Sequence, residues 1–138
     1  MQGTGYTFSA PADWTISRGG REVRAESGVE LVSVARFTLV RAYRPELWET
    51  VVPELDRAAA ELARQQSGTI SDSRTVTIAG RRARRYEFAY EHEGRELVER
   101  IGFVLRGKTE YLLLCRYERG GDVDACERLL RSFKLAAA

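Results

Sequence analysis

Alternating apolar and polar positions in the first third of the chain predict β-strands there. Tyr6 and Phe8 alternate with polar neighbours, and after a proline turn Trp14 and Ile16 do the same. A β-branched run then extends from Val29 to Val40. Because Trp14 alternates with Ile16, we expect its side chain to lie in the core.

Two glycine turns later in the chain predict consecutive β-hairpins. Glu93–Gly94 and Gly107–Lys108 are each flanked by apolar residues that alternate with polar ones. Two-residue turns would fix the register of both hairpins, and a slip of one residue would exchange the two faces of the sheet. The facing pairs are then Ala89 with Val98 and Glu87 with Arg100 in the first hairpin, and Phe103 with Leu112 and Glu99 with Arg116 in the second.

This register places apolar side chains on both faces of the sheet. One face receives Tyr86, Phe88, Ile101, Phe103, Leu112 and Leu114, and the other receives Ala83, Ala89, Val98, Gly102, Val104, Leu113 and Cys115. Both faces therefore need cover, either by helices on both sides or by a helix on one side and loops on the other. We expect an α+β fold, an antiparallel sheet of about six to seven strands with helices on both faces (an α/β/α sandwich), as a single domain over residues 1–138.

Two segments have the spacing of helices. An apolar stripe over Leu55–Leu62 predicts a main helix that begins near Pro53, after a short turn near Pro45–Val51, because a proline inside a helix would kink it. Gly68 is the expected stop signal. A second helix is expected over Asp122–Ser132, with its first aspartate as the N-cap.

Charge and length exclude several classes of protein. The 138 residues include 22 Lys or Arg and 20 Asp or Glu, and a net charge of +2 is too small to predict nucleic-acid binding. No apolar run approaches the ~20 residues of a membrane span. The start, Met1–Gly5, lacks the features of a secretory signal, which leaves a cytoplasmic protein or one whose signal has been removed.

The two cysteines bear on that choice. Cys115 lies in the last predicted strand and Cys126 in the last predicted helix, and a helix that folds back on its strand can bring the two into disulfide range. A disulfide would indicate an oxidising, extracytoplasmic compartment. The alternative is two independent buried thiols, which are common in cytosolic cores.

Residues for catalysis are sparse. His92 is the sole histidine, and it lies in a tight turn that offers neither a nucleophile nor an orienting partner. Two cysteines and one histidine do not make a four-ligand metal site, and no phosphate-binding glycine motif occurs. We therefore expect no enzyme activity, no catalytic or metal-binding residues and no cofactor.

An arginine run is the most prominent charged feature. Arg81, Arg82, Arg84 and Arg85 could contact an anion or a partner, such as an acidic lipid, a phosphate or an acidic protein. On a strand, however, Arg82 and Arg84 face one way and Arg81 and Arg85 the other. A solvated strand end near several glutamates is the interpretation we favour.

Three short motifs resemble the PsbP-like superfamily, which includes Ran-binding Mog proteins, DcrB-like periplasmic proteins and bacterial lipoproteins of unknown function. They are the opening Tyr6–Trp14 segment, the Val76–Ala83 strand with its glycine turn, and the closing Leu129–Leu135 segment. The resemblance implies an antiparallel sheet between helices, and binding or assembly roles rather than catalysis. The acidic surface of the Ran-binding branch has no counterpart here, so that activity is not expected.

Two functional hypotheses follow. The first is a non-catalytic extracytoplasmic binding or assembly domain, which would be secreted or held by a lipid anchor absent from this chain, with an unknown protein or small ligand as its partner. The second is a cytoplasmic chaperone-adaptor that binds an apolar helix of a secreted effector, a role that related cytoplasmic adaptors have and that a cysteine pair fits poorly. Under either hypothesis we expect a monomer or weak dimer, no nucleic acid, and no membrane contact except through such an anchor.

Overall fold

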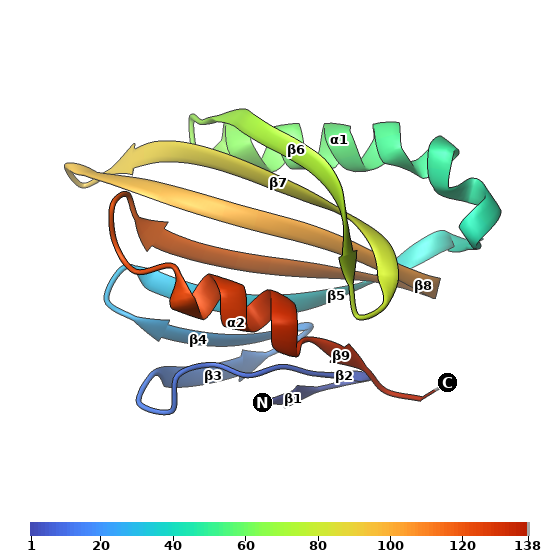
Figure 1. Ribbon diagram of the computed structural model, residues 1–138, viewed down its shortest axis with the longest axis horizontal. Helices are drawn as coiled ribbons and strands as arrows, with labels where there is room; N and C mark the ends of the chain where they lie inside the picture. Colours follow the sequence, from blue (N-terminus) through green and yellow to red (C-terminus); the bar gives the residue numbers. More distant parts are fainter. Residues whose placement is uncertain (138) are drawn as a thin grey trace.

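The computed structural model describes residues 1–137, which form two antiparallel sheets and two α-helices (Figure 1). The larger sheet has six strands in the order β3-β4-β5-β8-β7-β6, and the smaller has the order β1-β2-β9. The predicted α+β class is confirmed. In chain order the elements are β1 (Gln2–Gly3), β2 (Tyr6–Thr7), β3 (Thr15–Gly19), β4 (Glu22–Ser27), β5 (Glu30–Tyr43), a 3-10 turn η1 (Pro45–Leu47), α1 (Trp48–Gln65), β6 (Thr69–Ile78), β7 (Arg81–His92), β8 (Arg95–Glu118), α2 (Asp124–Ser132) and β9 (Lys134–Leu135).

Strand β8 folds back on itself at Gly107 and so supplies two adjacent arms of the large sheet (Figure 1). The backbone N–H of Arg119 donates to the carbonyl of Glu96 over 2.9 Å, and these two residues are equally distant in sequence from the Gly107–Lys108 turn. Gly107 has a φ of +58°, which glycine adopts readily at the first position of a two-residue hairpin turn. The second predicted hairpin therefore has the expected register. Its first arm pairs with β7, with Ala89 opposite Val98 and Glu87 opposite Arg100, and its second arm pairs with β5.

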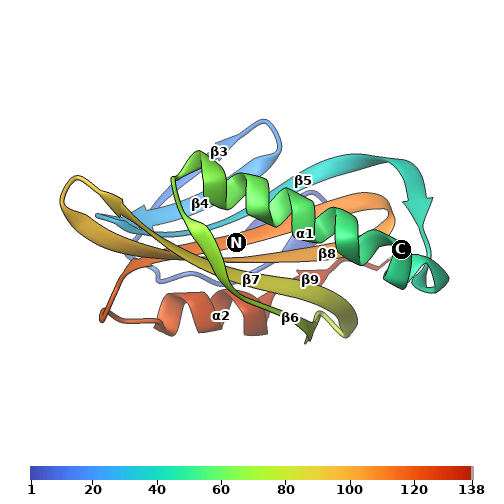
Figure 2. The ribbon, with the colours of Figure 1, turned by 90° about the horizontal axis from the view of Figure 1, so that it is seen from above.

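The two faces of the large sheet carry separate cores, as the register predicts. Helix α2 covers one face and α1 the other, so both faces have a helical cover (Figure 2). The core under α2 includes Ala83, Val98, Val104, Leu113, Cys115, Leu129 and Phe133. The core under α1 includes Leu55, Ala59, Tyr86, Phe88, Ile101 and Phe103, with Leu112 and Leu114 partly buried against it.

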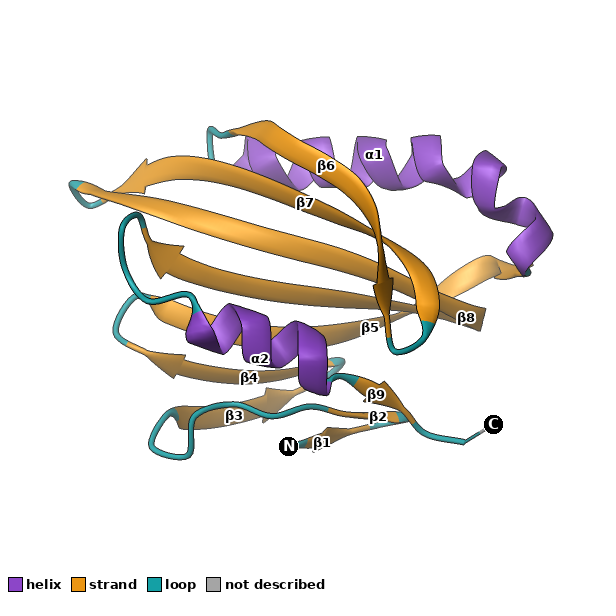
Figure 3. Cartoon of the chain, viewed as in Figure 1, coloured by secondary structure: helices purple, strands orange, loops and turns teal. Residues whose placement is uncertain are grey.

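Helix α1 begins earlier than the sequence predicts. It starts at Trp48, directly after η1, and runs through Pro53 without interruption, so the predicted start near Pro53 is wrong (Figure 3). Pro53 lies in the second turn, where it forfeits one intrahelical hydrogen bond. Trp48 offsets this loss, because its ring is buried and lies under the Arg82 guanidinium, 5.1 Å from the ring centre.

The expected stop at Gly68 is confirmed, although the left-handed residue is Ser67, with a φ of +61°. The N–H of Gly68 donates to the carbonyl of Ala63 over 2.8 Å and so closes the helix. A Cβ at position 68 would lie 2.8 Å from the carbonyl oxygen of Ala89. Glycine is thus needed here for the close approach of the helix end to β7.

Helix α2 and the small sheet close the opposite side of the molecule. The helix starts at Asp124 with Val123 as its N-cap, so the predicted N-cap at Asp122 is one residue early, although the Asp122 side chain accepts a hydrogen bond from the N–H of Asp124 over 2.8 Å. In the small sheet β2 pairs with β1 and with β9, and its Tyr6 ring lies 5.8 Å from the Phe133 ring. The two ends of the described chain therefore lie together.

The prediction that alternation with Ile16 buries Trp14 holds only in part. Trp14 is half-buried against the core under α2, but Ile16 is 50% exposed. Strand β3 is an edge of the sheet and all of its residues are exposed, so alternation there does not report a covered face.

Candidate functional site

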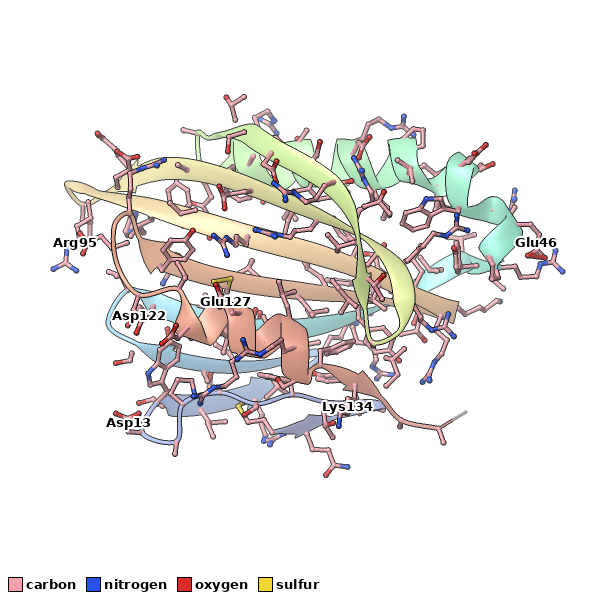
Figure 4. All side chains as sticks on the ribbon, viewed as in Figure 1. Asp13, Glu46, Arg95, Asp122, Glu127 and Lys134 are labelled. Carbon is pink, nitrogen blue, oxygen red and sulfur yellow. A yellow bond between two sulfur atoms is a disulfide. The ribbon has the colours of Figure 1, made fainter. Side chains whose placement is uncertain are left out.

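The two cysteines join the sheet to α2. Cys115 lies in the second arm of β8 and Cys126 in α2, and they are paired at disulfide distance with their Cα atoms 5.4 Å apart (Figure 4). Both residues are buried in the core under α2. The predicted pairing is confirmed, and this covalent link holds the helix on the sheet.

The arginine run divides between the two faces, as the alternation predicts. Arg84 contacts α1, where it donates to the Asp56 carboxylate over 3.1 Å and lies over the Tyr86 ring. Arg82 covers Trp48 on the same side. On the other face Arg81 donates to the carbonyl of Leu105 and Arg85 is half-buried. The four side chains therefore do not form one patch, and their contact with an anion or partner stays a prediction.

An apolar groove lies between α1 and the end of β5, on the face of the sheet that α1 covers. Strand β5 has a bulge between Thr38 and Tyr43, and the first half of α1 does not close over this stretch. The groove has a volume of about 390 Å³. This is within the range of small-molecule sites, roughly 300–1,000 Å³. Its apolar walls are formed by Leu39, Val40, Ala42, Tyr43, Leu47, Val51, Leu55, Ala58 and Leu105.

Three charged residues line this groove. Arg41 comes from β5, Glu54 from α1 and Glu110 from the second arm of β8. Burial raises the pKa of the Glu110 carboxyl, since the apolar walls solvate its charged form poorly. With two carboxylates and one arginine, the groove favours neutral apolar ligands over anionic ones.

No local pattern in the sequence predicts this groove, because the residues that line it are distant in the chain. Val40 and Tyr43 lie at the end of β5, Val51 and Ala58 lie in α1, and Glu110 lies in the second arm of β8. The one local indication is Glu110, a charged residue on the same strand face as the apolar Leu112 and Leu114.

A buried polar cluster lies on the same sheet face, the one that α1 covers, away from the groove. Glu99 is 6% exposed and accepts a hydrogen bond from the Tyr90 hydroxyl over 2.8 Å. Burial raises the pKa of Glu99, and burial together with this glutamate raises the pKa of Tyr90 to about 12. The neighbouring Arg116 donates to the carbonyl of Val29 over 2.8 Å. The cluster is closed by its own partners, which is typical of a structural network.

His92 is the exposed last residue of β7, directly before the Glu93–Gly94 turn, and it lies 3.7 Å from the Glu93 carboxylate. Within residues 1–137, no three His, Cys, Asp or Glu side chains come together as a potential metal site. Neither of the two described helices is both long and apolar enough to cross a membrane.

Comparison with known proteins finds similarity in structure alone. No protein-family model and no curated protein sequence matches the chain, so the PsbP-like assignment stays a prediction. A crystal structure from Bacteroides thetaiotaomicron VPI-5482 has a TM-score of 0.69 at 12% identity. The match covers 97% of this chain and 46% of that one, so the chain spans less than half of the longer protein.

LpqN of Mycobacterium tuberculosis, a protein involved in cell envelope biogenesis, is also similar in structure. Its TM-score is 0.58 at 10% identity, and the match covers 96% of this chain and 83% of LpqN. At these identities the similarity shows a shared fold. The chain is thus similar to distant bacterial proteins, one of which acts in the cell envelope.

Proposed function

We propose that this chain is a non-catalytic, extracytoplasmic binding domain of the cell envelope, and that its groove beside α1 binds the apolar chain of a neutral amphiphile. The observation that carries the proposal is the groove itself, where nine apolar side chains surround a volume of about 390 Å³ at the surface. Concave, largely apolar sites with few polar groups are typical of small-ligand binding.

The compartment rests on a separate observation. Cys115 and Cys126 are paired, and such pairs persist in oxidising environments outside the cytoplasm. The structural similarity to LpqN, an envelope protein, supports the same compartment.

The alternative, a cytoplasmic adaptor for an apolar helix, needs a broad apolar sheet face. On the side of α1, however, strand β4 presents three charged side chains, Glu22, Arg24 and Glu26. Their partners on β5 are Ala35, Ser33 and Leu31, in that order. A helix laid across this half of the sheet would bury those charges at a large cost in desolvation. The open sheet therefore favours a ligand confined to the groove.

The groove can be blocked without disturbing the core. Ala58 is exposed and lines the groove, so Ala58→Trp should fill it with an indole ring. Ala60→Trp is the matched control, because Ala60 is exposed on the same helix but does not line the groove. The readout is fluorescence titration with N-phenylnaphthylamine, a neutral apolar probe that becomes bright in apolar surroundings.

We expect the unmodified protein and Ala60→Trp to bind the probe alike, and Ala58→Trp to bind at least about tenfold more weakly, the factor that a loss of 1.4 kcal/mol produces. Absence of binding to the unmodified protein, or equal binding by both variants, would refute the groove as the site.

A further inference from the structure

Six cations lie between one end of the molecule and helix α2, beside clefts that no carboxylate of the described residues lines. The β6–β7 turn and the Gly107 turn of β8 lie at this end, and the β7–β8 turn lies at the other (Figure 1). Figure 4 shows Glu46 at this end of the long axis, Arg95 at the opposite end, and Lys134 between the two. We name the set of cations around the β6–β7 turn and the end of α2 the basic end. Its members are Arg81, Arg82, Arg106, Arg128, Arg131 and Lys134.

These cations line three neighbouring clefts that share residues. One cleft contains Arg81 and Arg82, and a second of about 740 Å³ contains Arg81, Arg106, Arg131 and Lys134. The third cleft contains Arg128, Arg131 and Lys134. Among the described residues no carboxylate lines any of the three. This is notable in a chain whose acidic and basic residues are nearly equal in number.

Elsewhere in the molecule several arginines are paired with nearby acids, while others, such as Arg57 and Arg95, have no ion-pair partner within residues 1–137. Arg64 pairs with Glu61, Arg74 with Asp72, Arg84 with Asp56, Arg100 with Glu87 and Arg119 with Glu96.

At the basic end the partners differ. Arg81, Arg82 and Arg106 donate to the backbone carbonyls of Leu105, Pro45 and Ala136, which orient the guanidinium groups without cancelling their charge. Within residues 1–137 only Arg131 has an ion-pair partner there, the exposed Glu127 at 3.9 Å. The positive potential of this end is therefore directed at solvent, and it attracts an anionic partner.

An exposed apolar side chain accompanies this charge. Val40 is 97% exposed on β5, three residues before Tyr43, which pairs with Gly107 and lines the cleft that contains Arg81. A fully exposed apolar side chain near a spread of unpaired cations fits the interface of a bilayer, where apolar groups enter the acyl boundary and cations contact phosphates. Cations on four separate elements, β7, β8, α2 and β9, suit a surface of many head groups better than one small ligand.

We propose that the basic end docks on an anionic bilayer surface, with Val40 entering the interface and the six cations facing lipid phosphates. Val40 and Tyr43 also line the apolar groove, so docking would turn the groove toward the membrane. The inference does not depend on the groove being a binding site.

Co-sedimentation with lipid vesicles tests the proposal. The full chain is mixed with vesicles of phosphatidylcholine alone or with one-third phosphatidylglycerol. Each mixture is measured in about 0.1 M and about 0.5 M NaCl, because the higher salt concentration screens the attraction between cations and lipid phosphates more strongly. We expect binding to the phosphatidylglycerol vesicles at low salt, and loss of most of that binding at high salt or without the anionic lipid.

Matched charge reversals locate the surface. Arg128→Glu with Lys134→Glu removes two exposed cations of the basic end, and Arg57→Glu with Arg95→Glu makes the same change of net charge elsewhere. Since each cation near an anionic surface contributes about 1 kcal/mol, the first variant should bind roughly thirtyfold more weakly. The second should remain within about twofold, and Val40→Ser should bind about fivefold more weakly through loss of apolar burial. Circular dichroism melts check that each variant is folded.

Several results would overturn the proposal. They are no binding of the unmodified protein to anionic vesicles, equal loss in both charge-reversal variants, or full competition by soluble glycerophosphate or polyglutamate at a concentration equal to that of the lipid phosphate. The first two exclude this surface, and the last assigns it to a small anion or an acidic protein. Ala58→Trp should keep vesicle binding, so failure of the groove hypothesis and failure of membrane docking are separate outcomes.

Discussion

The two faces of the large sheet are covered in different ways. Under α2 the cover is fixed by the Cys115–Cys126 pair and extended by the small sheet, and the core reaches from Tyr6 to Phe133. Under α1 the helix is held by side-chain packing and by the Asp56–Arg84 ion pair, and a groove stays open beside it. One face is therefore closed by a covalent link and a second layer of strands, while the other keeps an open groove, where we propose that a ligand binds.

Matched truncations of the two helices give the sharpest test of this contrast. Leu129 of α2 and Leu55 of α1 are both buried, with 1% and 4% of their surface exposed. Leu129→Ala should lower the free energy of unfolding by about 3–4 kcal/mol, because a closed core cannot collapse around the cavity. Leu55→Ala should cost about 2–3 kcal/mol, because the space it leaves adjoins the open groove. Urea denaturation measures both, and a larger loss for Leu55→Ala would contradict the comparison.

Removing the covalent link should have the next largest effect. The double variant Cys115→Ala with Cys126→Ala should lose roughly 2–3 kcal/mol, because the cross-link restricts the unfolded chain. Urea denaturation in the absence of reductant gives the value. The same loss should appear in the unmodified protein after reduction, which serves as the control. Two free thiols in denatured, non-reduced protein from its native compartment would contradict the pairing itself.

The groove carboxylate should have the smallest effect, and one that depends on pH. Burial raises the pKa of Glu110 in the folded protein, so the unfolded chain ionises first as pH rises and the folded state loses stability through this group. Glu110→Gln should therefore raise the Tm slightly at pH 7, and the gain should vanish in acid, where the carboxyl is protonated in both states. Thermal melts across pH measure the difference. Glu46→Gln, at an exposed site, should leave the Tm unchanged, and a gain in acid for Glu110→Gln would reverse the sign of the argument.

Local chemistry explains which parts of the fold the sequence predicts. The Gly107 turn sets the register of the β8 hairpin through a backbone preference, and the register then decides which side chains share a face. That same strand-and-helix pattern placed Cys115 and Cys126 together. The start of α1 was missed because the burial of Trp48, a tertiary contact, outweighs the local penalty of Pro53.

The groove also could not be predicted from the sequence, because it too depends on tertiary contacts. The groove depends on the bulge before Tyr43 and on where α1 crosses the sheet, and neither can be read from alternation. For the arginine run, the alternation of side chains between the two sheet faces is predictable from the sequence, but the residues that each arginine contacts are not. Arg84 is paired with Asp56, while Arg81 and Arg82 join cations from other elements at the basic end.

The small sheet has a consequence for how the chain is made. Tyr6 on β2 pairs with Leu135 on β9, so β2 cannot form this pairing until β9 has been synthesised. During synthesis the aromatic side chains of Tyr6 and Phe8 therefore have no completed core to enter, and the fold can close only after ribosomes have made the last helix. Under the extracytoplasmic function proposed above, this late closure would keep the chain unfolded until it has crossed the membrane.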